Sequence, residues 1–178
     1  METTERIVEA YVRYIKGWAT IPNIRCDGQL EIDLLAINPL TLERYHIESG
    51  VSVSGSYSKL TNHPYSVDEL KKRVKQAAQR RTLGYFRDRK FGDENVAAKL
   101  KEYGFHEGNY EKVVVTWGWQ VGVKEAAQEA KIALWDFRRL IAELAKEFAT
   151  QRTYFADDTL RTLHLFSLAE AAKDEREE

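Results

Sequence analysis

The chain of 178 residues has very little cysteine: Cys26 is the only one. A single cysteine excludes a disulfide within the chain and any metal site built from several thiolates. This composition is typical of the reducing cytosol, so we expect a cytoplasmic protein. Long apolar runs are also missing, and the first residues include acids where a signal peptide would be basic. We therefore expect a soluble protein that does not contact a membrane.

An excess of charge of either sign is absent as well. The net charge is −1, with 43% hydrophobic and 31% charged residues. A chain of this length and composition can bury the core of one globular domain. We expect a single domain over residues 1–178.

The basic residues are unevenly distributed despite the neutral total. Between Lys71 and Lys90 there are nine basic side chains and one acid, Asp88. Such a segment is either the solvated face of a helix or a surface that contacts phosphates. On the second interpretation, the nucleic-acid-binding residues would include Lys71, Lys72, Lys75, Arg80 and Arg81.

Hydrophobic periodicity and turn residues predict the order of the secondary structure. We expect helices at residues 4–17, 67–83, 95–103, 124–129, 138–148 and 158–173. We expect strands at residues 30–37, 44–54, 110–119 and 132–137, an irregular stretch at 18–29 and a loop at 55–64. Ser66 and Glu69 have the spacing of a capping box for the helix at 67–83. Two adjacent strands followed by strands separated by helices indicate an α/β fold with a mixed central sheet flanked by helices.

Two acids stand out because each interrupts a half-apolar strand. Asp33 lies in the first predicted strand and Glu48 in the second, where burial of an unpaired acid would be costly. Carboxylates held together on neighbouring strands form the hard-oxygen site that Mg²⁺ uses while bound to substrate phosphates. Side-chain alternation puts Glu31 on the face of Asp33, and His46 on that of Glu48. Glu31 is thus an alternative ligand, and His46 is either a general base or a partly buried strand residue.

The ordered set of these segments resembles the PD-(D/E)XK nuclease superfamily, whose members have the restriction-endonuclease-like fold. The resemblance rests on a first helix bearing an acid and on the strands GQLEIDLLA and VVVTW. It also includes the passage EAAQEAKIALWDFRRLI, so that it covers a core of about residues 5–148. Residues of about 150–175 would form a helical extension.

The resemblance implies a Mg²⁺-dependent DNA endonuclease or related phosphodiesterase, with Mn²⁺ as a second usable ion. Asp33 and Glu48 match the two motif acids, and Glu9 matches the helical acid that joins them at the metal. The motif lysine should stand two residues after Glu48, at a position that Gly50 occupies. Lys59 is the candidate for this catalytic lysine from outside the motif, and Lys75 is an alternative to it.

Two further hypotheses remain open. In one, the chain keeps the fold but is catalytically impaired because of Gly50, and binds nucleic acid or a protein partner. In the other, the protein is an unrelated α/β protein whose acids face water, with Asp33 and Glu48 more than about 10 Å apart and unable to share an ion. Proteins that resemble this one often form homodimers, which is a further expectation.

Overall fold

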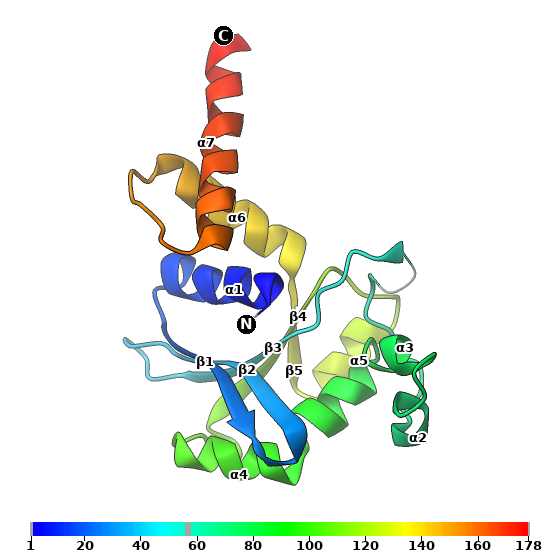
Figure 1. Ribbon diagram of the computed structural model, residues 1–178. Coiled ribbons are helices and arrows are strands. Elements are labelled where there is room, and N and C mark those ends of the chain that lie inside the picture. Colours follow the sequence, from blue (N-terminus) through cyan, green and yellow to red (C-terminus); the bar gives the residue numbers. More distant parts are fainter. Residues whose placement is uncertain (1, 56–57, 178) are drawn as a thin grey trace.

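A computed structural model describes residues 2–55 and 58–177, so Ser56 and Tyr57 of the predicted loop lie outside the described residues. Its centre is a five-stranded mixed sheet in the order β1-β2-β3-β4-β5 (Figure 1). The strands are β1 (Ala19–Cys26), β2 (Leu30–Ile37), β3 (Arg44–Ser49), β4 (Tyr110–Thr116) and β5 (Ile132–Asp136). Strand β2 runs antiparallel to its neighbours β1 and β3, whereas β4 and β5 run parallel to β3. The predicted α/β class with a mixed sheet is confirmed.

Helices cover both faces of the sheet (Figure 1). On one face lie α1 (Thr3–Ala10), the π-helix η1 (Tyr11–Ile15), α6 (Phe137–Thr150) and α7 (Asp158–Glu177). On the other lie α4 (Glu94–Glu102), α5 (Val123–Glu129) and a second π-helix, η4 (Tyr85–Lys90).

The centre of β4 is buried on both sides. Val113 and Val115 join the core beneath α1 and α6, while Val114 between them joins the core beneath η4 and α5. All three are almost fully inaccessible to solvent, as the apolar run in the sequence predicts.

The stretch expected to be irregular contains a strand. Residues 18–29 include β1, which pairs with β2 along its length, with Pro22 opposite Leu34. The proline is tolerated because β1 is an edge strand, where one side of the backbone needs no partner in the sheet. Because β1 contains a proline and its apolar and polar residues alternate only weakly, hydrophobic periodicity does not predict this strand.

Three other elements are shorter than predicted, the first being β4, which ends at Thr116 and not at residue 119. Strand β3 ends at Ser49, not at residue 54. The helix expected at 67–83 is replaced by two single turns, α2 (Val67–Leu70) and α3 (Gln76–Gln79). The basic residues between these turns stand three and four positions apart, so a continuous helix would align like charges. Only the predicted Ser66 cap remains, with its hydroxyl accepting from the Glu69 amide.

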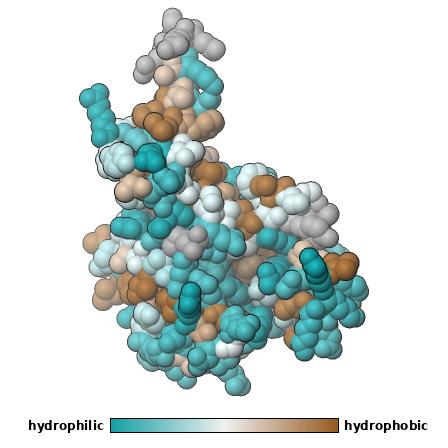
Figure 2. Space-filling model, viewed as in Figure 1, coloured by the Kyte–Doolittle hydropathy of each residue, from teal (hydrophilic) through white to brown (hydrophobic). Residues whose placement is uncertain are grey.

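The remaining helices agree closely with expectation. Helices α4, α5 and α6 begin and end within two residues of their predicted limits, and α7 continues four residues further than predicted. Helix α7 projects from the body of the molecule, and apolar side chains lie on its exposed part (Figures 1 and 2). Leu165 and Phe166 are each 61% exposed there. Among the described residues, none of the helices has the length and apolar character needed to cross a membrane.

Candidate functional site

Asp33 and Glu48 lie next to each other in the sheet because β2 and β3 pair antiparallel. The register places Leu34 opposite Ile47, so the next residues, Asp33 and Glu48, follow side by side. Asp33 also accepts a hydrogen bond from the Ser49 amide at 2.7 Å. The hypothesis that the two acids lie far apart and face water is therefore wrong.

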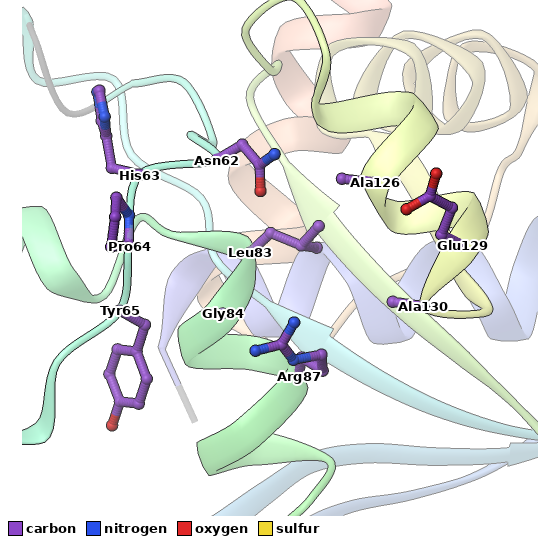
Figure 3. A pocket seen from close by; sticks show the side chains of 10 residues that line it. All are labelled: Asn62, His63, Pro64, Tyr65, Leu83, Gly84, Arg87, Ala126, Glu129 and Ala130. Atoms are coloured by element: carbon purple, nitrogen blue, oxygen red, sulfur yellow. The ribbon is translucent and has the colours of Figure 1, made fainter.

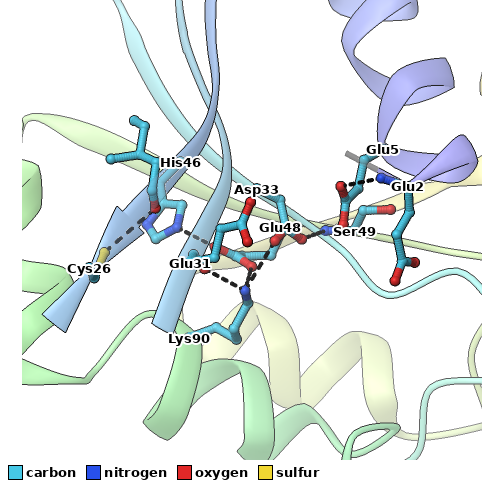
Figure 4. A network of polar contacts seen from close by, with 10 residues as sticks. Glu2, Glu5, Cys26, Glu31, Asp33, His46, Glu48, Ser49 and Lys90 are labelled. Atoms are coloured by element: carbon cyan, nitrogen blue, oxygen red, sulfur yellow. Dashed lines mark hydrogen bonds and ion pairs between the residues drawn. The ribbon is translucent and has the colours of Figure 1, made fainter. Parts of the chain in front are cut away.

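A lysine that the sequence motif did not indicate joins the two acids. The ammonium of Lys90 lies 2.5 Å from Glu48 Oε2 and 3.1 Å from Asp33 Oδ1. It also donates to the carbonyl oxygen of Glu31 at 2.7 Å (Figure 4). Lys90 is the last residue of η4, so a helix far along the chain supplies the cation.

The two lysines proposed from the sequence lie elsewhere. Lys59 is exposed and, among the described residues, contacts neither Asp33 nor Glu48. Lys75 is also exposed and pairs with Glu69 at 2.5 Å. Among the described residues, the lysine that contacts the two acids is Lys90 and neither of these two.

The structure also explains why residue 50 is a glycine. A Cβ atom at Gly50 would lie 2.4 Å from Cζ of Phe86, which is closer than two carbon atoms can approach. Phe86 is buried in η4, the same helix that carries Lys90. The aromatic ring therefore occupies the space that a side chain at position 50 would need, and one turn further on the helix delivers the ammonium.

His46 contacts Glu48 and fixes the orientation of its carboxylate. Both side chains are 0% exposed, and His46 Nε2 lies 2.7 Å from Glu48 Oε1. Burial, together with the charge of Lys90, lowers the pKa of His46 to about 3. A neutral ring can donate from Nε2 to the carboxylate, which fixes one oxygen of Glu48 and leaves the other to Lys90. Because His46 is enclosed, it cannot reach a substrate as the general base considered above.

The charges in this cluster influence one another. Burial raises the pKa of Asp33 to about 7, with a further contribution from the charge of Glu48. Burial likewise raises the pKa of Glu48 to about 7, against the opposing effect of Lys90. For Lys90, burial favours the neutral amine, but the two carboxylates outweigh it and the pKa is raised. The three groups form one titrating unit with two acids and a single cation.

The acid of α1 that lies beside this unit is Glu5 and not the predicted Glu9. Glu5 lies near Ser49 in Figure 4, and its pKa is raised by burial and by the charge of Asp33. Glu9 lies one turn further along α1, where it is 4% exposed and ion-paired with Arg6 at 2.6 Å. Four residues separate two points on the same helix face, so the sequence could not indicate which turn lies over the acids.

Of the five predicted nucleic-acid-binding residues, four are exposed to solvent and one is half-buried. Lys71, Lys72, Lys75 and Arg80 are exposed on and around α2 and α3. Arg81 is half-buried and donates to the carbonyl oxygens of Gly50 and Val51. Arg81 therefore ties the basic segment to the end of the strand that carries Glu48.

The cluster could hold a hard cation through few protein ligands. Asp33 and Glu48 supply carboxylate oxygens, and the buried hydroxyl of Ser49 has no hydrogen-bond partner among the described residues. Among the described residues, no group of three or more acidic, histidine or cysteine side chains is arranged to hold a metal. Mg²⁺ keeps several water ligands and takes others from substrate phosphates. Two carboxylates therefore suit Mg²⁺ better than a metal that needs all of its ligands from the protein.

A cavity of about 460 Å³ beside η4 is not this site (Figure 3). It lies between residues 62–65, the start of η4 and α5, and Arg87 on its wall is paired with Asp88. The hydroxyl of Tyr65 points away from it (Figure 3). None of the three charged residues that contact one another at the cluster lines this cavity.

Comparisons with protein-family models, with curated proteins and with solved structures find no match. The chemistry of the cluster is therefore inferred from its own geometry.

The contact between Gly50 and Phe86 leads to a first prediction. Gly50→Ala should lower the free energy of unfolding by about 1–3 kcal/mol, because the added methyl group overpacks the Phe86 ring. Combining it with Phe86→Leu should cost at least about 1 kcal/mol less than the sum of the two single variants, because leucine lacks the clashing atom. Chemical denaturation measures all three variants.

Gly118→Ala is the matched control for this cycle. The nearest atom to a Cβ at Gly118 is 3.6 Å away, which is an ordinary contact, and neither glycine has the positive φ that would itself disfavour alanine. Additive effects of Gly50→Ala and Phe86→Leu would contradict the packing argument.

A second prediction concerns the pH dependence of stability. Folding raises the pKa of Asp33 from 3.8 to about 7, so between these values the native state keeps a proton that the unfolded state has released. The contribution of Asp33 to stability must fall as pH rises through this window. Asp33→Asn cannot ionise, and it should gain about 1–4 kcal/mol of stability relative to the wild type between pH 4 and pH 8.

The measurement is urea denaturation at several pH values. Asp68→Asn serves as the control, because the Asp68 side chain is 91% exposed and should give a curve parallel to that of the wild type. Parallel curves for Asp33→Asn and the wild type would show that Asp33 does not titrate as described.

Proposed function

We propose that this protein is a Mg²⁺-dependent nuclease of the PD-(D/E)XK type that hydrolyses phosphodiester bonds in DNA. One observation carries the proposal: Asp33, Glu48 and Lys90 meet at the junction of the antiparallel and parallel parts of the sheet. Two acids and a lysine in mutual contact are the chemical groups that the resemblance requires, although the lysine comes from η4 and not from β3.

Each residue has a role that follows from its chemistry. Asp33 and Glu48 would hold the ion, which when bound lowers the pKa of a water molecule and neutralises charge on the phosphate. Lys90 keeps a positive charge beside the acids and can stabilise the additional negative charge of the transition state. His46 positions Glu48 through its 2.7 Å contact. Glu5 extends the negative surface on the side of α1.

The basic segment supports nucleic acid as the substrate. Its exposed lysines and Arg80 surround two short turns, and Arg81 connects them to the backbone beside Glu48. Basic side chains in this position can contact the phosphate backbone without reading the base sequence.

A catalytically impaired binding protein is the second candidate. The observation that favours it is the direct pairing of Lys90 with both acids, since an ammonium at that place competes with a metal ion. Titration with Mn²⁺ distinguishes the two candidates. A nuclease should bind the ion in the wild type and not in Glu48→Ala, whereas an impaired protein should bind it in neither.

The third prediction compares two lysines. Asp33→Ala and Glu48→Ala should abolish Mg²⁺-dependent cleavage of DNA. Lys90→Met should lower the cleavage rate by about 10²–10³-fold, which is typical of removing one preorganised electrostatic contact from a transition state. Lys59→Met, at an exposed lysine, should cleave like the wild type. Loss of activity in Lys59→Met with retention in Lys90→Met would refute the assignment of Lys90.

The fourth prediction concerns DNA binding in the absence of divalent metal. Replacing Lys71 and Lys72 together by glutamine should weaken binding equally for unrelated DNA sequences. The slope of log K against log salt should fall by about 0.9 for each phosphate that the variant no longer neutralises. Lys101→Gln, at an exposed position of α4, is the control. An unchanged salt slope in the double variant would exclude this segment from the DNA interface.

A further inference from the structure

A pocket at the free edge of the sheet lies apart from the charged cluster. It has a volume of about 250 Å³ and is formed by η1, β5, the start of α6 and the segment after β4. Its chief lining residues are Tyr11, Lys16, Trp119, Trp135, Asp136 and Arg139. Asp33, Glu48 and Lys90 do not contribute to it, so its chemistry requires a separate explanation.

The walls of this pocket are aromatic. Trp119 and Trp135 are both half-buried, so part of each indole is left accessible. Trp135 is supported from behind by an edge contact with Tyr11, at 6.1 Å between ring centroids, and by Trp18 at 6.2 Å. Trp18 in turn stacks on Tyr45 at 4.2 Å. The indole of Trp135 therefore belongs to a rigid aromatic layer that can accept a planar ligand.

The rim carries positive charge that the protein does not fully neutralise. The Lys16 ammonium lies 5.7 Å from the ring centroid of Tyr11 and 6.0 Å from those of Trp18 and Trp135. Within the described part of the chain, no carboxylate forms a direct ion pair with it, although its charge also acts on Glu143, the partner of Arg139. The Arg139 side chain is 80% exposed, and its Nε forms an ion pair with Glu143. Cation–π contacts thus hold an unpaired ammonium beside the aromatic walls.

A planar aromatic wall beside two cations matches the two parts of a nucleotide. We propose that this pocket binds a single unpaired nucleotide, with the base against the indole rings and the phosphate between Lys16 and Arg139. Stacking on aromatic side chains combined with a basic rim is the general means by which proteins hold unpaired bases. A base inside a duplex cannot use the pocket, because its faces are covered by its neighbours.

The sheet register places this pocket near the charged cluster. Leu134, which also lines the pocket, lies beside Val114, and Val114 lies beside Glu48. Two strand spacings separate Glu48 from Leu134, which is about 10 Å. At this distance a single strand bound in the pocket would have room to extend toward β3, whereas a free 5′-nucleotide would occupy the pocket alone.

Binding in EDTA tests the proposal without depending on cleavage. The full chain is titrated with three ligands: a fluorescently labelled single-stranded oligonucleotide, a blunt duplex of the same sequence and a free 5′-mononucleotide. The variant is Lys16→Gln/Arg139→Gln, in which both changes lie at exposed positions. The control is Lys146→Gln, an exposed lysine of α6 that does not line the pocket.

We expect the double variant to bind the single strand at least about tenfold more weakly at moderate salt. Its salt slope should be lower by about 0.7 for each phosphate that Lys16 and Arg139 no longer neutralise. If the mononucleotide also binds and competes with the oligonucleotide, the source of the ligand is the free nucleotide. If only the oligonucleotide binds, the source is an unpaired strand.

Two results would overturn the proposal. One is equal affinity of the double variant and Lys146→Gln for the single strand and the mononucleotide. The other is tighter binding of the blunt duplex than of the single strand together with an equal weakening of both in the double variant. Neither result bears on whether Asp33 and Glu48 support cleavage, since no divalent ion is present.

Discussion

The contact of one ammonium with two buried carboxylates determines the arrangement of this part of the protein. Asp33 and Glu48 are adjacent because β2 and β3 pair, and both would be costly to bury as unpaired charges. Lys90 supplies the compensating charge from η4. The ammonium can reach the two acids because η4, which belongs to the segment between β3 and β4, lies against the end of β3.

The packing around the ammonium follows from the same requirement. The Phe86 ring of η4 packs against Gly50, and a Cβ atom at position 50 would clash with that ring. Gly50 and Lys90 are therefore linked, because the missing side chain at position 50 leaves room for Phe86 of the helix that carries Lys90. The π-helical turns of η4 agree with the frequent occurrence of such irregular helices at functional sites.

Sequence patterns predicted β2, α4, α5 and α6 closely. Strand β2 has the predicted limits, since its apolar residues, acid and following turn are all local signals. Lys90 could not be selected in this way, because 42 residues separate it from Glu48 in the chain and only tertiary packing brings them together. The choice between Glu5 and Glu9 failed for a related reason, namely that both lie on one face of α1. Asp33 and Glu48 could be selected from the sequence because a charged residue is conspicuous in a run of apolar residues.

The charge balance of the cluster is compatible with the metal-binding role proposed above. A buried charge without a compensating partner is costly to the fold. Here two acids face one ammonium, His46 is held neutral, and Glu5 adds further negative potential at the edge. With both acids ionised, the cluster keeps an uncompensated negative charge beside Lys90. A divalent cation shared between the carboxylates would remove that excess and would also lower the raised pKa values of both acids.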